Sequence, residues 1–256
     1  MRYKIESHRN ALTILENEPD LKKAWQQVKY IINSISEGDI IKTHNKYYSK
    51  SNKSISPALN RLFRERFKDW NWRAESPIFK ETSDDYKGKN WRLDFVKNNS
   101  ISIEVAYNHG GSIAWNLLKP VLASELNHVE KAAQTKVGII ITATTELKKI
   151  GGFDNAVGLF ENYVIYLKPL MNQLTIPLLI IGLEAPKHFK IEHYKLTNPN
   201  GTKITVGKVI FKGAKKTLNG GVIKRNYKFK GRIYFRKKYR QIKKEMRGSY
   251  YKGKIK

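Results

Sequence analysis

The sequence predicts an α/β fold with a mixed central sheet flanked by helices, followed by a basic, β-rich C-terminal extension. Residues 137–142 and 177–183 are continuous apolar runs, which are typical of strands in a sheet covered on both faces. Around them, segments in which apolar and polar residues alternate are followed by segments with apolar residues at helical spacing. In residues 199–256, basic residues alternate with apolar and aromatic ones, a pattern that favours strands.

The N-terminal segment is predicted to start with one strand and continue as helices. Residues 3–6 have the pattern of a short strand, and residues 11–15 that of a short helix. Residues 21–32 place apolar side chains at helical spacing, so we expect one buried helical face. Gly38 and Asp39 are expected to close this unit.

A polar segment and a further helix come next. Residues 42–53 are polar and are expected to form a loop or an exposed hairpin. The following helix is predicted to begin at residues 54–57, because proline is well tolerated in a first helical turn. Basic side chains decorate this helix; they would reach phosphate or simply form a solvated face.

Strands and helices are expected to alternate from Trp91 onward. Proline removes a helical hydrogen bond, so we expect a kink or break near Lys119, which precedes Pro120. In order, the expected elements are strands at 91–96 and 101–107, a helix at about 112–133, a strand at 137–142, a helix at about 154–174 and a strand at 177–183.

The chain is strongly basic, and the excess charge is concentrated near its end. Its 49 Lys and Arg against 22 Asp and Glu give a net charge of +27 on 256 residues. Residues 199–256 hold 20 of the basic residues and one acidic residue, net +19, which leaves +8 for residues 1–198. This imbalance favours a polyanionic partner. We therefore expect a core domain at 1–198 and a nucleic-acid-contacting extension at 199–256.

Several classes of protein are disfavoured by what the sequence lacks. It has no cysteine, so disulfides, thiolate metal sites and a Cys nucleophile are excluded. The first ten residues lack the apolar segment of a signal peptide, and no stretch approaches the roughly eighteen apolar residues of a membrane span. It has no phosphate-binding loop, dinucleotide fingerprint or serine nucleophile elbow. We expect a cytoplasmic protein without a membrane partner.

Two carboxylates occupy neighbouring strands of the expected sheet. Asp94 lies near the end of one strand, and Glu104 follows ten residues later in the next. Two carboxylates held together in this way suit Mg²⁺, which can activate a water for phosphodiester hydrolysis. Alternation groups Glu104 with Ser102, opposite Ile103, and so predicts that Glu104 faces solvent from a half-buried sheet. An exposed hairpin pair is therefore the alternative interpretation.

The surrounding segments carry a resemblance to a known family. They are ISPALNRLF at 55–63, DFVKNNSISIEV at 94–105, and the apolar strand at 137–142 followed at a distance by residues 178–184. In order and spacing the chain resembles the PD-(D/E)xK nucleases and, more narrowly, the BglII/BstYI-type restriction endonucleases, over roughly residues 1–190. The resemblance implies a restriction-endonuclease-like core and a dimeric, Mg²⁺-dependent type II enzyme that cuts both strands of a short palindromic DNA site.

The resemblance also implies roles for the carboxylate pair. Asp94 falls on the metal-binding position and Glu104 on the second acidic position, and the carbonyl of Val105 is a candidate further ligand. Ala106 falls where family members place Gln, Lys or Glu to orient or deprotonate the attacking water. A methyl group does neither. Three explanations remain open: an engineered substitution that traps substrate, a helper residue elsewhere in the chain, and an inactive binding protein.

Three residues are candidates for supporting roles. His109 or Lys119 would reach back to the strand end from the following loop or helix, although a DNA-facing loop residue and a solvated helix residue are the simpler interpretations. Glu65 would serve as an outer metal group, or equally as the partner in an intrahelical salt bridge.

Two groups of residues are expected to contact DNA. The resemblance places the loop with Asn108 and His109 against DNA, and an amide side chain pairs well with the edge of adenine. In the extension, we expect twisted β-ribbons with a hairpin turn at 219–220, which would present cations to successive phosphates. The alternative is a tail that only keeps the protein soluble. The candidate cations there are Lys224, Arg225, Lys228, Lys230, Arg232, Arg236, Lys237, Lys238 and Arg240.

Three functions follow from these observations. The first is a homodimeric, Mg²⁺-dependent type II restriction endonuclease acting on double-stranded DNA. The second is a non-catalytic nucleic-acid-binding protein on a degenerate nuclease fold, and the third is a structure-selective repair nuclease. Asp84-Asp85 and the pair Glu125 and His128 are weaker candidate metal sites, for which a solvated turn and a helix surface are the better interpretations.

Overall fold

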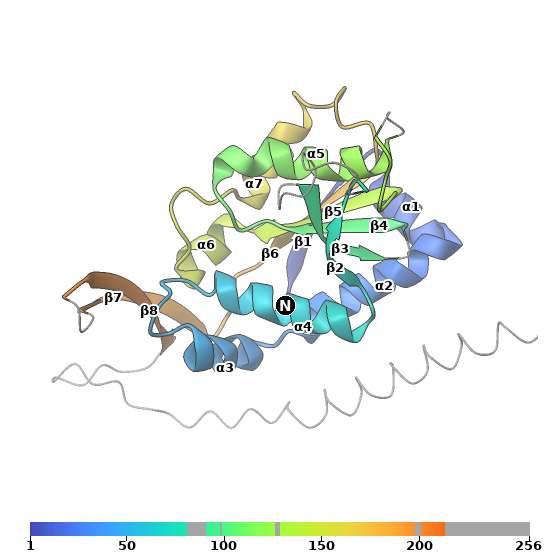
Figure 1. The fold of residues 1–256 in the computed structure, drawn as a ribbon. Helices are drawn as coiled ribbons and strands as arrows, with labels where there is room; N and C mark the ends of the chain where they lie inside the picture. Colours follow the sequence, from blue (N-terminus) through green and yellow to red (C-terminus); the bar gives the residue numbers. More distant parts are fainter. Residues whose placement is uncertain (81–90, 98, 126–128, 198–200, 213–256) are drawn as a thin grey trace, which may run out of the picture. The chain divides into compact units, whose positions relative to one another are not determined.

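Six strands form a mixed central sheet in the computed structural model (Figure 1). The sequence predicts the mixed sheet and five of these strands, but not β2. The structure describes residues 1–80, 91–97, 99–125, 129–197 and 201–212. The strand order is β1-β6-β5-β4-β3-β2. The strands are β1 (Tyr3–His8), β2 (Arg73–Pro77), β3 (Arg92–Lys97), β4 (Ile101–Val105), β5 (Val137–Ala143) and β6 (Leu178–Leu183).

The centre of the sheet is parallel and its edges are antiparallel. β4, β5 and β6 run parallel, whereas β1 is antiparallel to β6, and β3 is antiparallel to both β4 and β2. Every residue of β5 and β6 is buried. The two continuous apolar runs are thus strands covered on both faces, as predicted.

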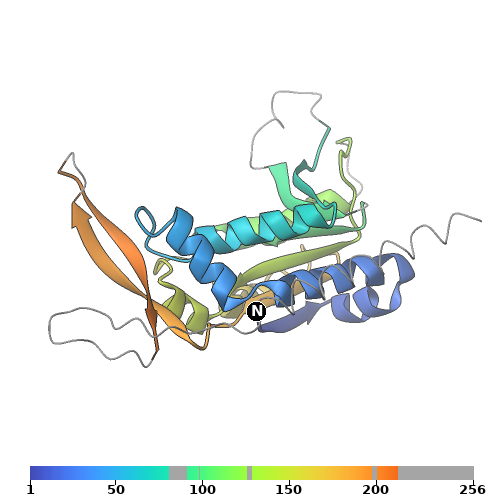
Figure 2. The same ribbon diagram turned by 90° about the horizontal axis from the view of Figure 1, so that it is seen from below.

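Helices cover both faces of this sheet. Figure 1 shows α5 and α7 above it and α2 and α4 below it, and in the view from below α2, α3 and α4 lie in front of the strands (Figure 2). Under α5 and α7 the core contains Leu117, Ile140 and Tyr163, and on the other face Phe67 stacks on Phe95 with ring centroids 4.4 Å apart. The helices are α1 (Ala11–Asn17), α2 (Pro19–Ser34), α3 (Glu37–Tyr47), α4 (Ser56–Asp69), α5 (Ile113–Ser124), α6 (Thr145–Gly151) and α7 (Phe160–Leu167), with a 3₁₀ turn η3 (Gly110–Ser112) before α5.

Helix α3 corrects the prediction for residues 38–53. Residues 38 and 39 do not close the preceding unit, and much of the polar run is helical instead of a loop or hairpin. Ser36 and Asp39 form a capping box at the helix start, and Ile40 and His44 bury one narrow stripe. The other faces of α3 are polar, so the run lacks the wide apolar face of a typical surface helix.

Two predicted helices are shorter than expected. The segment before α7 pairs with the loop after β4, through Gly110 N to Ala156 O (2.7 Å) and Gly158 N to Asn108 O (3.0 Å), so α7 starts only at Phe160. α5 continues through Pro120, where a kink or break was expected near Lys119, and ends at Ser124 instead of reaching residue 133.

A two-stranded hairpin completes the described part of the chain. β7 (Phe189–Thr197) pairs antiparallel with β8 (Lys203–Phe211), and both belong to the compact unit Met1–Lys212. The alternation in residues 204–211 therefore marks a strand, as predicted. His44 Nε2 on α3 donates to Gly207 O in β8 at 2.8 Å. None of the helices in the described ranges is long and apolar enough to cross a membrane.

Candidate active site

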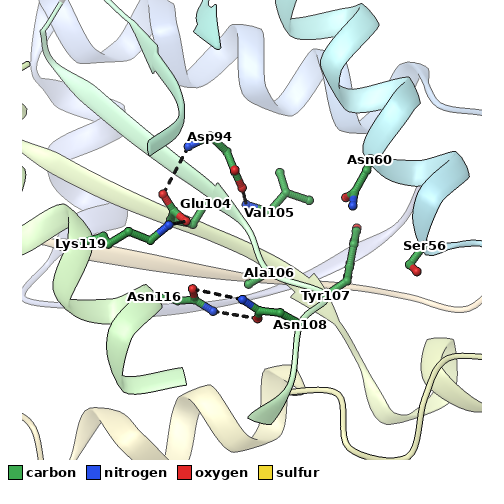
Figure 3. Close-up of a pocket in the computed structure, with 10 residues that line it drawn as sticks. All are labelled: Ser56, Asn60, Asp94, Glu104, Val105, Ala106, Tyr107, Asn108, Asn116 and Lys119. Carbon is green, nitrogen blue, oxygen red and sulfur yellow. Dashed lines mark hydrogen bonds and ion pairs between the residues drawn. The ribbon is translucent and has the colours of Figure 1, made fainter. Parts of the chain in front are cut away.

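Asp94, within β3, and Glu104, near the end of β4, lie together beside an open cavity of about 260 Å³ (Figure 3). Phe95 pairs with Ile103, so the antiparallel register brings the two carboxylates next to each other. Asp94 N donates to Glu104 Oε1 at 3.3 Å, and Val105 N donates to Asp94 Oδ2 at 2.7 Å. Each carboxylate is therefore held by a backbone amide of the other strand.

Glu104 does not face solvent, contrary to the expectation from alternation. Its exposed fraction is 3%, and Ser102, which shares its face, is fully buried. Alternation correctly predicted that Glu104 and Ile103 lie on opposite faces of the strand. The face itself was wrongly assigned to solvent, because α5 packs against β3, β4 and β5 and covers it.

Lys119 extends from α5 to this pair and is buried, with an exposed fraction of 9%. Its ammonium forms an ion pair with Glu104 Oε2 and donates to the carbonyl of Arg92 at 3.2 Å. The interpretation of Lys119 as a solvated helix residue is therefore wrong. Helix and sheet approach closely here, and only glycine fits at position 138 of β5. A Cβ at Gly138 would lie 2.5 Å from Pro120 Cβ.

Burial dominates the electrostatics of the carboxylates. Burial and the neighbouring negative charge of Asp94 raise the pKa of Glu104 to about 8, against the opposing effect of Lys119. Burial also raises the pKa of Asp94, and the Val105 amide and Lys119 oppose that shift. The buried Glu104 and the partly buried Asp94 lie beside a single ammonium, so the ionised site carries net negative charge, which a bound cation would offset.

The donor set of this site fits a hard divalent cation. Asp94 and Glu104 supply carboxylate oxygens, and Val105 lines the same cavity. In the described part of the chain no third Asp, Glu or His joins them. Mg²⁺ commonly binds through one or two carboxylates and keeps several waters, so it does not need a third acidic ligand.

Ala106 contributes no polar side chain to the cavity. Its exposed fraction is 3%, and its methyl group belongs to the apolar cluster beneath α5. Its amide donates to Ile141 O at 2.8 Å, and its carbonyl accepts from Thr142 Oγ1 at 2.8 Å. The position is thus fixed by backbone pairing with β5.

The loop after Ala106 carries the expected base-contacting residues on the surface. Asn108 and His109 are both exposed. Asn116 Nδ2 donates to Asn108 Oδ1 at 3.0 Å, and His109 Nδ1 accepts from Gly111 N at 3.0 Å, which caps η3. Glu65 forms an exposed ion pair with Arg61 four residues away, as the alternative interpretation of this residue predicts.

Four cavity residues were not anticipated from the sequence. Helix α4 contributes Ser56 and Asn60, β4 leads into Tyr107, and α5 contributes Asn116 (Figure 3). The hydroxyl of Tyr107 is buried without a hydrogen-bond partner among the described residues. One usable signal was present: Asn116 and Lys119 stand three residues apart in an otherwise apolar helix, and this spacing places them on one face.

Several sequence candidates fall outside the described residues. These are Asp84, Asp85 and His128, and the extension residues Lys224, Arg225, Lys228, Lys230, Arg232, Arg236, Lys237, Lys238 and Arg240.

Comparison with known proteins agrees with this geometry. A family model described as restriction endonuclease BglII/BglIII matches residues 3–183. The solved structure of restriction endonuclease BglII complexed with a DNA 16-mer is similar at a TM-score of 0.54 and 16% identity, over 82% of this chain and 100% of that chain. Free BglII gives a TM-score of 0.47 and 15% identity with the same coverage. A search of curated protein sequences finds no match.

The family match covers well over half of the chain and includes both strands of the carboxylate pair. The structural likeness supports the same fold, with its mixed six-stranded sheet between helices. Family and fold thus agree with the resemblance seen in the sequence. The chain belongs to the BglII/BglIII family of restriction endonucleases, which makes it a type II site-specific endonuclease.

Proposed function

We propose that the protein is a homodimeric, Mg²⁺-dependent enzyme that cuts both strands of a short palindromic site in duplex DNA. The observation that supports this best is the pairing of the partly buried Asp94 with the buried Glu104, held by reciprocal backbone hydrogen bonds across β3 and β4. Such preorganised carboxylates cost folding energy and serve no evident packing purpose.

In this proposal Asp94 and Glu104 hold the metal, with the carbonyl of Val105 as a further ligand. Bound Mg²⁺ would supply Lewis acidity and lower the pKa of a water. The Val105 amide fixes the orientation of Asp94, and the Asp94 amide fixes that of Glu104. The water oxygen would form a bond to phosphorus while the bond from phosphorus to an ester oxygen breaks. The water would lose a proton to solvent and the leaving oxygen would take one up, so the strand would be hydrolysed without a covalent enzyme intermediate.

DNA is proposed to lie across the cavity mouth. Asn108 lines the same cavity as the carboxylates, the next residue His109 is exposed, and both are suited to contact bases. The extension cations from Lys224 to Arg240 would contact phosphates and contribute affinity without reading sequence. BglII itself has been crystallised with a DNA 16-mer, which favours duplex DNA as the partner. Two-fold symmetry of a homodimer would match that of a palindromic site.

The proposal is tested by cleavage of plasmid DNA with Mg²⁺, in wild type and in Asp94→Asn. The substitution keeps the size of the side chain and removes its charge, so we expect discrete fragments from the wild type and at least about 100-fold slower cleavage from the variant. Glu65→Gln is the matched control: it removes a carboxylate from an exposed ion pair on α4 and should cut normally. Equal cleavage by Asp94→Asn would contradict the assignment of the metal ligands.

Ala106 favours one alternative, a non-catalytic DNA-binding protein on this fold. The alternative predicts that neither the wild type nor Ala106→Gln, Ala106→Lys or Ala106→Glu cuts DNA. It also predicts that Asp94→Ala leaves DNA binding and metal affinity unchanged.

Sedimentation velocity measures the proposed dimer directly, and a monomer on cognate DNA would exclude the symmetric arrangement.

A further inference from the structure

We propose that Lys119, delivered from helix α5, is the cationic group of the active site that position 106 lacks. The inference rests on the proposed nuclease function and deepens it. It concerns a single side chain that approaches the carboxylate pair from a different element than β4, which carries Ala106.

The position of the Lys119 ammonium is fixed on two sides. One contact is the ion pair with Glu104 Oε2, and the other is the hydrogen bond to Arg92 O at 3.2 Å. An ammonium has three donors, so one remains after these two contacts. Lys119 lines the same cavity as Asp94 and Glu104, and the third donor is available to a water or a phosphate oxygen there (Figure 3).

The helix that carries Lys119 is placed unusually close to the sheet. Pro120 packs against Gly138, where any Cβ would lie 2.5 Å from the proline ring and 2.6 Å from Leu178 Cδ2. Lys119 is adjacent to that contact, so the close approach brings its ammonium down to β3 and β4. Burying a lysine here, at 9% exposure, is costly unless the charge is paired.

Lys97 illustrates what a half-buried structural lysine does in this protein. It lies on β3, three residues after Asp94, and its ammonium donates to the carbonyls of Trp70 at 2.7 Å and Asn71 at 3.3 Å. Those contacts tie two backbone segments together. Lys119 instead forms an ion pair with Glu104, the carboxylate that is proposed to hold the metal.

Ala106 and Lys119 are complementary in size. Both line the cavity, and the methyl group of Ala106 packs beneath α5. A long side chain at position 106 would extend from β4 toward the same space that Lys119 enters from α5. The small residue on the strand therefore leaves room for the long residue on the helix, and one ammonium occupies the site in either arrangement.

A fixed ammonium at this point acts on the reaction through its charge. It orients the attacking water by hydrogen bonding and stabilises the negative charge that develops on the phosphoryl oxygens. Neither effect requires the ammonium to release its proton. Removal of one preorganised donor of this type costs about 100-fold to 1,000-fold in rate.

The test compares Lys119→Met with the exchange variant Ala106→Lys/Lys119→Ala, with Lys97→Met as the matched control. Single-turnover cleavage is measured with Mg²⁺, and DNA affinity with Ca²⁺. We expect Lys119→Met to cut at least about 100-fold more slowly while its DNA affinity stays within about threefold. The exchange variant should recover part of that loss, and Lys97→Met should cut like the wild type.

The absence of cysteine in the chain gives a second route that does not depend on one variant folding well. Lys119→Cys introduces a unique thiol, which can be alkylated with 2-bromoethylamine in denaturant before refolding. The thiolate sulfur displaces bromide and forms a thioether that ends in an ammonium. Recovery of cleavage after this treatment, but not after capping with a neutral methylthio group, supports a role for the charge and not for the volume.

The outcomes separate this inference from the proposed function. Wild-type cleavage with equally fast cleavage by Lys119→Met overturns the role of Lys119 and leaves the nuclease assignment intact. An inactive wild type that is activated by Ala106→Lys alone also overturns it, since Lys119 then fails to compensate. If no form of the protein cuts DNA, the proposed function and this inference both fail. Equal recovery with the aminoethyl and the methylthio groups would likewise reject the role of the charge.

Discussion

Asn116 connects the candidate active site to the core beneath α5. Its exposed fraction is 2%, and its side-chain nitrogen donates to Asn108 Oδ1 at 3.0 Å and to the hydroxyl of Tyr163 at 2.7 Å. Tyr163 is fully buried, and burial raises the pKa of its hydroxyl. A single amide therefore satisfies a core hydroxyl and restrains the loop that begins after β4.

We predict that Asn116→Ala lowers the free energy of unfolding by about 1–3 kcal/mol, because it leaves the buried Tyr163 hydroxyl unpaired. Urea denaturation measures the loss. Adding Tyr163→Phe should recover part of it, since the orphaned hydroxyl is then absent. Asn60→Ala is the control, because Asn60 is exposed in the same cavity and should change stability by no more than about 0.5 kcal/mol. A double variant that only adds the two losses would contradict this account.

Residue types and strand phase could be predicted from the sequence, but their surroundings could not. Asp94 and Glu104 were identified as a pair, and alternation gave the correct phase of Glu104. Alternation does not show what covers a strand face, so the burial of Glu104 under α5 was missed. Lys119 was judged by its helix position alone, and only the packing of Pro120 on Gly138 shows why it is buried.

At the scale of elements, α5 packs closely on β5 because Gly138 has no side chain to keep Pro120 away. The site depends on this contact, because α5 supplies both Asn116 and Lys119. The sequence predicted both elements, yet it gave no distance between them.

Gly138→Ala is predicted to lower the free energy of unfolding by about 1–3 kcal/mol and to slow cleavage, because the added methyl group overlaps Pro120 and Leu178. Gly38→Ala is the control. A Cβ at Gly38, in α3, would meet only Ser36 Oγ at 3.7 Å, so this change should stabilise the protein by about 0.4–1 kcal/mol. Thermal unfolding measures the two opposite signs, and a neutral Gly138→Ala would argue against the close approach.

The docking of the β7-β8 hairpin on α3 is predicted to weaken at acidic pH. His44 is fully buried, its Nε2 donates to Gly207 O, and its Nδ1 has no hydrogen-bond partner among the described residues. Burial lowers the pKa of His44 below its usual value near 6.5. The unfolded chain then binds a proton that the folded chain does not, so this contribution is complete above about pH 6.5 and is lost as the pH falls toward the folded pKa.

Urea denaturation at several pH values between about 7.5 and 5 tests this effect, whose slope for one group is at most about 1.4 kcal/mol per pH unit. His44→Gln can donate to Gly207 O and does not titrate, so the variant should show a smaller slope. An unchanged slope would assign the acid sensitivity to other groups.

Elements were predicted best where one signal dominated. The buried strands β5 and β6 were fixed by continuous apolar runs, and β8 by its alternation. α3 was missed because its buried stripe is only Ile40 and His44 within a polar run. α7 starts later than periodicity would allow because the segment before it is hydrogen-bonded to the loop after β4 through Gly110 and Gly158. α5 ends at Ser124, and the segment after it forms other backbone hydrogen bonds, such as Ala132 N to Ile78 O at 2.9 Å.

At the scale of the whole molecule, composition and fold point to the same partner. The family and the mixed sheet were predicted from three segments of sequence, because their order constrains the topology more than any one of them does. The net charge of +27 predicts a polyanionic partner without saying where it binds. That the extension, which carries most of this charge, contacts DNA is a proposal.

Neutralising Arg236, Lys237, Lys238 and Arg240 to Gln is predicted to weaken DNA binding and to flatten its salt dependence. Each lost phosphate contact should reduce the slope of log affinity against log salt by about 0.9, so the change is at most about 3–4. Fluorescence anisotropy between low and moderate salt measures the slope. Lys22→Gln/Lys23→Gln, on the exposed side of α2, controls for net charge alone. An equal reduction of the slope per charge removed in both variants would identify a non-specific charge effect.

The reciprocal hydrogen bonds of Asp94 and Glu104 have a consequence for how the protein folds. A slip of one residue between β3 and β4 would turn every side chain of the slipped strand to the other face, so Asp94 and Glu104 would no longer share a face. Both side-chain contacts to the facing amides would then be lost together. The register that pairs the two carboxylates is thus the same register that directs the apolar side chains of β3 and β4 into the core, so a misaligned chain would also lack the candidate active site.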